Sequence, residues 1–311
     1  MSEGPEVRRT ADRITEALLG RTIEAVEFRK RSSPPGDELA SRVVGAKVKD
    51  VRTYGKHIVL AFTRGLYLHN HMMMWGKWRT YARSAFDAGK ARPPPRVQWR
   101  SRRDEDGPPA RKTPTDVRRD SRVRLILATA ETVAVEFNGP ILRFTRTDPA
   151  TEPAIERLGP DGLAARFPVA TALERLRERR GRKLADLLLD QTFVAGIGNK
   201  YKSEILFTLG LPPFRRAADL GVDEERALLA EIRRTLRMGY EQAGRTRPLE
   251  PGEAANQWNF KHWVFRRSGR PCWRCRDRIR SDRSSSARVT YWCPTCQSGE
   301  AEERSALAGR A

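Results

Sequence analysis

The sequence lacks any long run of apolar residues, and its first ten residues contain no apolar segment. No stretch approaches the roughly eighteen apolar residues that a membrane-spanning helix needs. The segment from Met1 to Thr10 carries several charges, whereas a signal peptide requires an apolar stretch there. These absences argue against a secreted or membrane-spanning protein, and the sequence predicts an intracellular one.

Acidic residues are few relative to basic ones. Lysine and arginine total 60 against 39 acidic residues, which gives a net charge of +21. This excess indicates a polyanionic partner, with nucleic acid as the first candidate and an anionic membrane surface as the second. The 311 residues suffice for two ordinary domains, and 39% hydrophobic residues allow a sizeable core.

Cysteine is scarce and confined to one region. The only four cysteines form two Cys-x-x-Cys pairs separated by seventeen residues: Cys272, Cys275, Cys293 and Cys296. This spacing is typical of a two-knuckle site that binds Zn²⁺ through four thiolates. Because four thiolates leave no open coordination position, the pattern predicts a structural zinc site in a reducing compartment.

The region around the cysteines is strongly basic. Residues 261–297 contain ten basic and two acidic residues, with Tyr291 and Trp292 among them. A hairpin closed by zinc and carrying this charge is suited to holding a phosphate backbone. The alternative is a solvated basic face without a partner.

Glycine is informative at one junction between helical segments, Gln191–Tyr201. Gly196 and Gly198 allow close backbone approach, and the helix that follows offers free N–H groups. The junction therefore either cradles a phosphate, with Asn199 and Lys200 beside it, or makes a tight turn between two helices.

Hydrophobic periodicity divides the chain into a β-rich part, a helical part and the cysteine hairpin. We expect an N-terminal domain over 1–150, a helical domain over 151–255, a zinc finger over 256–297 and a disordered tail over 298–311. Residues 83–121 contain six prolines and few large apolar groups. They predict a flexible basic insertion, because such a segment buries too little surface to offset its ordering entropy.

Four separated segments carry a family resemblance. They are Glu3-Gly-Pro-Glu6, Tyr54-Gly-Lys56, Asp190 to Glu204, and the hairpin ending Arg288-Val-Thr-Tyr-Trp-Cys-Pro-Thr-Cys296-Gln. Together they resemble the formamidopyrimidine-DNA glycosylase and endonuclease VIII family of base-excision repair enzymes. The likeness covers most of 2–80 and 122–297. The hairpin from Ser285 to Cys293 is closer to the endonuclease VIII branch.

The resemblance implies a two-domain α+β fold. An N-terminal β-sandwich with flanking helices would be the catalytic domain, followed by a helix–two-turn–helix domain with a four-cysteine zinc-finger β-hairpin. The implied activity is that of a DNA glycosylase and abasic-site lyase, which breaks an N-glycosyl bond and then a carbon–oxygen bond. Its partner would be damaged double-stranded DNA, which the protein would bind as a monomer, and no membrane would be involved. Oxidised pyrimidines would be the substrates.

The same resemblance assigns catalytic roles to Ser2, Glu3 and Lys56. The N-terminal amine of Ser2 would attack the sugar C1′ and form a Schiff base; an α-amine has a pKa of about 7.7–8.0, so part of it is unprotonated near neutrality. Glu3 would act as general acid/base beside the positive end of a helix expected over 6–19. Lys56 matches the family's strand-start lysine, which contacts phosphate and assists catalysis.

Further residues match the family's DNA-binding positions. Asn199 and Arg288 match residues that hold the phosphates flanking a flipped nucleotide, and Glu6 matches a position that supports the lesion pocket. The segment His71 to Gly76 resembles the loop that fills the void left by the flipped base. The wedge would then consist of Met73, Met74 and Trp75. Residue type alone favours a buried apolar cluster for these three.

One position departs from the family pattern, because Ser2 stands where the family usually has proline. Removal of Met1 would expose a primary amine, whose imine must stay protonated to act as an electron sink. We therefore expect base excision to persist while strand cleavage is slower or altered. The alternatives are a glycosylase for bulky adducts or crosslinks with weak lyase activity, a non-catalytic damaged-DNA-binding protein, and an RNA-binding zinc protein.

Overall fold

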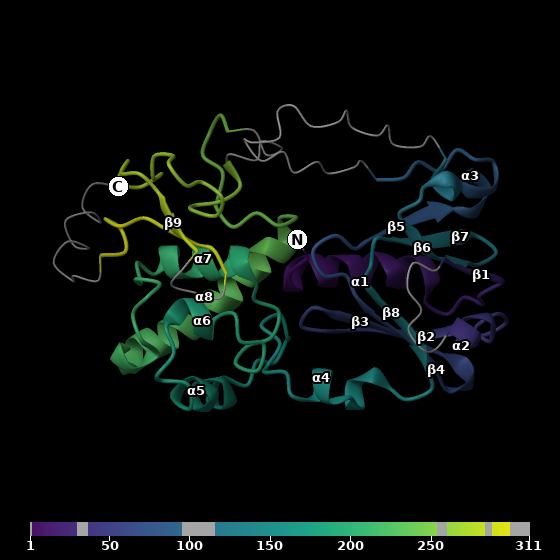
Figure 1. Ribbon diagram of the computed structural model, residues 1–311, viewed down its shortest axis with the longest axis horizontal. Helices are drawn as coiled ribbons and strands as arrows, with labels where there is room; N and C mark the ends of the chain where they lie inside the picture. The colour runs from purple at the N-terminus through teal and green to yellow at the C-terminus, as the bar shows by residue number, and fades with distance from the viewer. Residues whose placement is uncertain (1, 30–36, 95–115, 254–259, 284–287, 299–311) are drawn as a thin grey trace. The chain divides into compact units, whose positions relative to one another are not determined.

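A computed structural model describes residues 2–29, 37–94, 116–253, 260–283 and 288–298 (Figure 1). The helices are α1 (Gly4–Leu18), α2 (Asp37–Ser41), α3 (Arg83–Asp87), α4 (Pro153–Glu156), α5 (Val169–Arg177), α6 (Leu184–Leu187), α7 (Asn199–Thr208) and α8 (Val222–Glu241). The strands are β1 (Ala25–Phe28), β2 (Val48–Tyr54), β3 (His57–Phe62), β4 (Leu66–His71), β5 (Lys77–Ala82), β6 (Val123–Ala128), β7 (Thr132–Phe137), β8 (Ile141–Thr145), β9 (Arg280–Asp282) and β10 (Thr290–Trp292). Within the described ranges, no helix combines the length and apolar character needed to cross a bilayer.

The chain forms two compact units. Unit 1 comprises residues 1–2, 10–53 and 57–151, and unit 2 comprises 3–9, 54–56 and 152–311. Two short N-terminal segments therefore group with the C-terminal part of the chain, whereas the sequence suggested one continuous N-terminal domain. These two segments contain the resemblance motifs that begin at Glu3 and at Tyr54.

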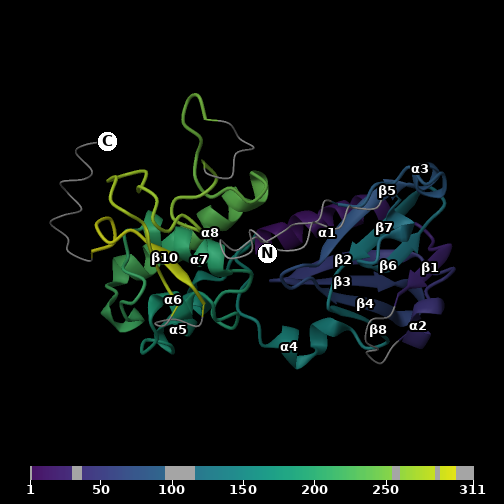
Figure 2. The ribbon, with the colours of Figure 1, turned by 45° about the horizontal axis from the view of Figure 1, so that its top comes forward.

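Unit 1 is built on two four-stranded sheets (Figure 2). One has the strand order β1-β6-β7-β5 and the other β2-β3-β4-β8. The ring of Phe28 in β1 lies edge-on to that of Phe144 in β8, with centroids 6.2 Å apart, so side chains of the two sheets meet. Strands β6 and β7 are rich in the branched residues that favour extended backbone, and they are almost wholly buried. This arrangement is the β-sandwich that the resemblance implied.

The two ends of the expected flexible insertion, 83–121, are ordered, contrary to the sequence-based expectation. Phe86 of α3 lies with Ala91 and Val117 in a buried cluster that includes residues of β6 and β7. The Val117 N–H donates to the Ala91 carbonyl at 3.0 Å, which ties the two ends together. A few apolar residues spaced through a basic stretch give no periodic signal, yet they complete the edge of this core. The middle of the insertion, 95–115, lies outside the described residues, as does the tail from 299 onward.

Unit 2 combines the helices α4–α8 with the C-terminal hairpin (Figure 1). Helices α5–α8 enclose a core in which Phe193, Tyr201 and Ile232 are fully buried. Strands β9 and β10 pair antiparallel, with Ser281 opposite Tyr291. The structure therefore has the expected two-part α+β fold, with a helical part that carries a cysteine hairpin.

Glu136 is a buried carboxyl in the middle of the sandwich. Its Oε2 accepts a hydrogen bond from Gly139 N at 3.0 Å, while Oε1 has no partner within the described part of the chain. Burial raises the pKa of Glu136 from 4.5 to about 8, although the Gly139 N–H and the charge of Arg124 oppose the rise. The folded protein therefore keeps a proton that the unfolded chain releases.

We expect this carboxyl to make the protein less stable as pH rises. Between pH 4.5 and about 8 the folded state binds more protons than the unfolded state, so the free energy of unfolding falls by at most about 1.4 kcal/mol per pH unit. Glu136→Gln should flatten this dependence and be more stable than the wild type at pH 9. Urea unfolding at pH 5, 7 and 9 measures both, with the exposed Glu131→Gln as control. Parallel pH curves for Glu136→Gln and wild type would contradict the assignment.

Candidate active site and metal centre

Three segments far apart in the sequence meet at glycines in unit 2. The Gly4 N–H donates to the Gly196 carbonyl at 2.8 Å. A Cβ on Gly4 would lie 2.9 Å from Gly196 Cα, and a Cβ on Gly55 would lie 2.9 Å from Ala195 Cβ. A larger residue at Gly4 or Gly55 would push these segments apart, and Gly196 has a positive φ of 96° that favours glycine. The glycines therefore bring the two N-terminal segments against the junction that precedes α7.

The Glu3 side chain is buried at the N-terminus of α7. Its Oε1 accepts a hydrogen bond from Lys200 N at 3.0 Å, and its Oε2 accepts one from Tyr201 N at 3.3 Å. A Cβ on Gly198 would lie 2.3 Å from Glu3 Cδ, so only glycine leaves room for this carboxyl. The sequence predicted that N–H groups at the start of this helix could bind a phosphate. In the structure they donate to a carboxyl of the same chain.

Glu3 is also the first backbone acceptor of α1. Its carbonyl accepts a hydrogen bond from Val7 N at 2.9 Å, and its own N–H donates to Glu6 Oε2 at 3.2 Å. In this second bond the Glu6 side chain accepts the backbone N–H at the start of the helix, as the glutamate of a capping box does. The sequence suggested that the Glu3 carboxyl lies at the positive end of α1. Because Glu6 occupies that place, the Glu3 carboxyl lies at the positive end of α7 instead.

Burial raises the pKa of the Glu3 carboxyl above its usual value. The charge of Lys200 is the largest effect that opposes this rise, the charge of Glu6 adds to it, and the charge of Lys56 opposes it. A carboxyl shifted toward neutral pH can both give and take a proton under working conditions. The environment of Glu3 therefore favours retention of a proton to higher pH than in an exposed glutamate.

Two residues of α7 that the sequence did not assign to the catalytic site hold Glu6 in place. Lys200 Nζ donates to Glu6 Oε1 at 2.5 Å, and the Tyr201 hydroxyl donates to the same oxygen at 3.0 Å. The capping-box spacing of Glu3 and Glu6 was a visible signal. Their partners, however, lie 194 and 195 residues further along the chain, so no local pattern could reveal them.

Lys56 and Arg288, which were predicted from separate segments, come together near Glu3. Burial lowers the pKa of Lys56, while the charge of Glu3 raises it and that of Arg288 lowers it further. Arg288 is exposed in the loop before β10. Asn199 is the first residue of α7, and its Oδ1 is buried without a hydrogen-bond partner in the described ranges. The structure thus gathers an acid/base carboxyl and two cations in one region of unit 2.

In unit 1, the loop between β4 and β5 presents apolar side chains to solvent. Met73, Met74 and Trp75 are 47%, 43% and 47% exposed, which excludes the buried cluster that residue type alone favoured. Met73 adopts a positive φ of 49°, so the loop turns sharply there. The backbone nitrogen of Ser2 donates to the Met73 carbonyl at 3.4 Å.

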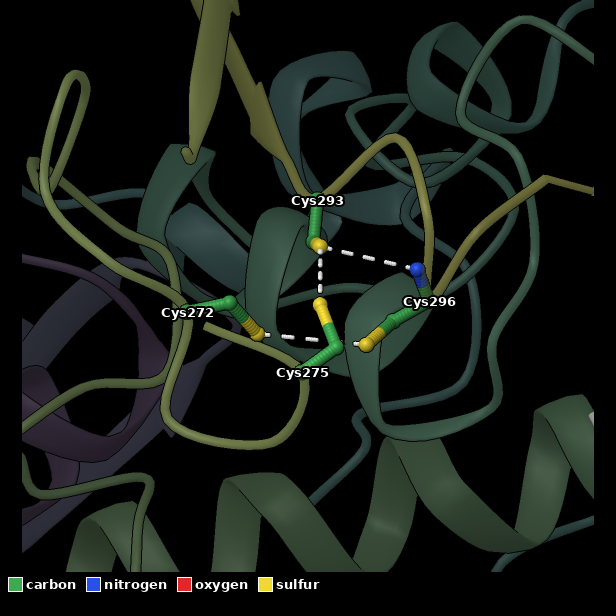
Figure 3. Close-up of side chains that lie close together, drawn as sticks. All are labelled: Cys272, Cys275, Cys293 and Cys296. Atoms are coloured by element: carbon green, nitrogen blue, oxygen red, sulfur yellow. Dashed lines mark hydrogen bonds between the residues drawn. The ribbon is translucent and has the colours of Figure 1, made fainter. Parts of the chain in front are cut away.

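The four cysteines converge at the base of the hairpin, and Figure 3 shows their side chains pointing toward one another. The Cys272 and Cys296 sulfurs are 3.8 Å apart and those of Cys275 and Cys293 are 3.4 Å apart, so neither pair is a disulfide. Tetrahedral zinc with Zn–S bonds of about 2.3 Å requires sulfurs about 3.8 Å apart. All four ligand atoms lie within 4.8 Å of one another, so the cluster could hold such an ion.

The hairpin is fixed to α7 by buried charged side chains. Lys202 Nζ donates to Thr290 Oγ1 at 2.9 Å and to the Val289 carbonyl at 3.4 Å. Burial lowers the pKa of Lys202 to about 8. Two residues further along the helix, both oxygens of the buried Glu204 accept backbone N–H groups from residues 263–265. Helix α7 therefore positions the N-terminal carboxyls and the hairpin together.

Chemically, this site combines proton transfer with anion binding. The Glu3 carboxyl can exchange a proton, and Lys56 and Arg288 supply positive charge around it. Cations of this kind are the usual ligands of phosphate groups. A substrate with an acid-labile bond close to a phosphate suits such a site.

Comparison with family models finds two matches that together cover most of the chain. Residues 1–141 match the formamidopyrimidine-DNA glycosylase N-terminal domain. Residues 158–248 match the formamidopyrimidine-DNA glycosylase H2TH domain, the helix–two-turn–helix.

Similar proteins include full-length relatives. The chain is 34% identical over 304 residues to a probable endonuclease 8 of Streptomyces coelicolor, covering 97% of this chain and 95% of the relative. It is 32% identical over 300 residues to endonuclease 8 of Escherichia coli O1:K1 / APEC, covering 96% and 100%. Among solved structures, the Lactococcus lactis Fpg in complex with DNA containing an abasic site has a TM-score of 0.72 at 20% identity, covering 95% and 99%. That structural likeness supports the same fold.

Proposed function

The chain belongs to the formamidopyrimidine-DNA glycosylase and endonuclease VIII family, and on this basis we propose that it excises oxidised pyrimidines from double-stranded DNA and then cleaves the abasic site. The observation that carries the proposal is the buried Glu3 carboxyl. Its raised pKa, its interaction with Lys56, and the interaction of Lys56 with Arg288 give an acid/base group beside positive charge that can bind phosphate. The likeness to endonuclease 8 proteins favours oxidised pyrimidines over other damaged bases.

The nucleophile in this proposal is the nitrogen of Ser2. Once Met1 is removed, that nitrogen becomes a primary amine adjacent to Glu3. The amine attacks C1′, the N-glycosyl bond breaks, and the departing base takes a proton from the Glu3 carboxyl. The C1′–O4′ bond then breaks as O4′ takes a proton, which leaves a protonated imine between the Ser2 nitrogen and C1′. A base removes the C2′ proton, the electron pair moves toward the imine, and the C3′–O bond breaks with the phosphate as leaving group. Water finally hydrolyses the imine and releases the Ser2 amine.

The remaining site residues hold the DNA in this proposal. Arg288, Lys56 and Asn199 bind the phosphates that flank the flipped nucleotide, and Glu6 supports the lesion pocket. The exposure of Arg288 supports its role, as does the charge around Glu3. Met73, Met74 and Trp75 fill the void in the duplex, and their solvent exposure supports that role.

We expect Trp75→Ala to weaken binding to abasic-site DNA without destabilising the protein. Stacking of an aromatic ring on a base contributes about 1–3 kcal/mol, and loss of a half-exposed ring changes folding stability by about 0.5 kcal/mol or less. Fluorescence anisotropy with an abasic-site duplex measures the affinity, and thermal melting measures the stability. The exposed Val44→Ala is the matched control. Unchanged affinity in Trp75→Ala would remove Trp75 from the wedge.

We further propose that Cys272, Cys275, Cys293 and Cys296 hold Zn²⁺. The sulfur separations fit a tetrahedral thiolate site. Each pair also has the N–H···S bond of a metal knuckle, from Arg274 N to the Cys272 sulfur and from Cys296 N to the Cys293 sulfur. Bound zinc would be structural, because all four coordination positions are filled by the protein.

Borohydride trapping tests the proposed chemistry. Protein whose N-terminus has been defined by intact mass is incubated with abasic-site and thymine-glycol duplexes under borohydride, and the products are resolved on a denaturing gel. We expect a covalent complex with both duplexes, and its loss when one residue is added before Ser2. Absence of any trapped complex, with tight binding to abasic-site DNA, would contradict the lyase proposal and favour a damage-binding protein. Retention of Met1 in an active protein would rule out Ser2 as the nucleophile.

A further inference from the structure

Lys200 is a buried cation at the centre of the N-terminal site. Only 7% of the residue is exposed. Its ammonium donates to Glu6 Oε1 and to the Gly244 carbonyl at 3.2 Å, and it lies 4.2 Å from the ring centroid of Tyr201. These contacts leave the ammonium facing the interior of unit 2, so it is poorly placed to bind DNA directly.

Glu6, the hydrogen-bond partner of Lys200, also bonds the backbone next to the N-terminal amine. Glu6 Oε1 receives Lys200 Nζ and the Tyr201 hydroxyl, while Glu6 Oε2 accepts the N–H of Glu3. The Glu3 nitrogen is separated from the Ser2 nitrogen by the Ser2 Cα and carbonyl carbon alone. Fixing the Glu6 carboxyl therefore fixes the peptide that carries the N-terminal amine.

Lys200 also contributes to the electrostatics of Glu3. The charged and titratable groups facing this carboxyl are Lys200 and Tyr201 on α7, Glu6 on α1, Lys56 in the turn before β3, Lys202 further along α7, and Arg266 before the hairpin. Lys200 is the largest of the charges that lower the pKa of Glu3, and its backbone N–H also binds Glu3 Oε1.

We propose that Lys200 is a positioning residue for the N-terminal reaction: its ammonium holds Glu6, and Glu6 in turn holds the Ser2–Glu3 peptide against α7. This inference rests on the proposed function, because it assigns the reaction to the N-terminal amine. It accounts for the burial of the Lys200 ammonium beside the Glu6 carboxyl.

Lys202 supplies a matched comparison on the same helix. It is also buried, but its ammonium bonds the hairpin at Thr290 and Val289. Loss of either lysine removes one buried charge from α7. Loss of Lys200 removes the ammonium that bonds Glu6, whereas loss of Lys202 removes one that bonds the hairpin, so the two substitutions separate positioning of the reaction centre from general disruption of the helix.

The experiment compares Lys200→Met, Lys200→Arg and Lys202→Met in the full chain. We expect Lys200→Met to lower kcat for base excision by about 10- to 100-fold with little change in KM, because a small misplacement of reacting groups has effects of this size. In the pH–rate profile of Lys200→Met, the limb that reflects titration of Glu3 should move to higher pH. The reason is that the positive charge of Lys200, which lowers the Glu3 pKa, is lost. Lys200→Arg should restore most of kcat. Lys202→Met should raise KM and move the pH limb less than Lys200→Met, because Lys200 is the largest of the charges that lower the Glu3 pKa.

Hydrogen exchange provides a readout that does not depend on activity. We expect faster amide exchange in the peptide covering residues 2–7 of Lys200→Met, and wild-type exchange there in Lys202→Met. If Lys200→Met does not fold, Tyr201→Phe removes the other side-chain donor to Glu6 Oε1 and should produce the same effects with smaller size.

The outcomes separate failure of this inference from failure of the proposed function. An inactive wild-type protein would refute the proposed function, while the exchange measurement would still decide whether Lys200 fixes the N-terminal peptide. An active wild type, with Lys200→Met unchanged in kcat, pH profile and exchange, would overturn the inference alone. A rise in KM without loss of kcat in Lys200→Met would also overturn it, because Lys200 would then act in DNA binding.

Discussion

Glu3→Gln is expected to slow base excision by about 10²- to 10⁴-fold, the range found when a positioned general acid/base is removed. Glutamine has nearly the shape of glutamate, and its carbonyl oxygen can still accept the Lys200 N–H. It cannot give or take a proton. Because the side chain is buried and does not itself supply positive charge for phosphate, binding to abasic-site DNA should fall by no more than a few-fold.

Single-turnover excision of thymine glycol, together with anisotropy on abasic-site DNA, measures this effect. The exposed Glu16→Gln on the same helix is the matched control and should behave as the wild type. The pH profile of the wild type should show a limb above the usual carboxyl range, because burial raises the Glu3 pKa. Retention of near-wild-type rates by Glu3→Gln would place the acid/base function on another group.

Cys296→Ser is expected to abolish metal binding and to lower affinity for abasic-site DNA by about 10- to 100-fold. Structural zinc with cysteine ligands provides about 10–16 kcal/mol of apparent binding energy, so loss of one thiolate should unfold the hairpin. Arg288 lies immediately before strand β10, and unfolding of the hairpin would displace it. Loss of one hydrogen-bonded contact between arginine and phosphate costs about 1.5–3 kcal/mol, which corresponds to the expected change in affinity.

Metal content and DNA binding should be measured on the same preparations. Wild-type protein should contain one zinc per chain by mass spectrometry, and Cys296→Ser should contain none. Hydrogen exchange should rise in the hairpin of this variant but not in the sandwich strands, because the core of unit 1 does not include the cysteines. A Cys296→Ser variant that lacks zinc but retains full DNA affinity would show that the hairpin does not grip the backbone.

Patterns local to the sequence predicted much of this fold. Alternating and continuous apolar runs marked several sandwich strands, and the spacing of Cys272, Cys275, Cys293 and Cys296 identified the metal-binding hairpin. The ends of the insertion were misjudged. Phe86 and Val117 are isolated apolar residues in a basic segment, and their burial depends on a core supplied by distant strands.

The catalytic centre was predicted less completely. Motif resemblance predicted roles for Glu3, Glu6 and Lys56, and in the structure Lys56 interacts electrostatically with both Glu3 and Arg288. The motif resemblance did not reveal that Glu3 accepts hydrogen bonds from the first N–H groups of α7. From the sequence, these groups could equally have bound a phosphate. Lys200 escaped assignment to the catalytic site because its partner Glu6 lies at the opposite end of the sequence.

The sequence by itself determined the α+β class, the basic character, the cysteine site and the membership of a DNA-repair family. The basic character follows from composition, the cysteine site from spacings of a few residues, and the family from the resemblance of its motifs. Only the tertiary structure decided which groups surround Glu3, because burial and charge at that carboxyl arise from segments almost 200 residues apart that meet at Gly4, Gly55 and Gly196. The shift in the pKa of Glu3 is therefore a property of the assembled site, since desolvation and Coulomb interaction depend on distance in space and not on position in the chain.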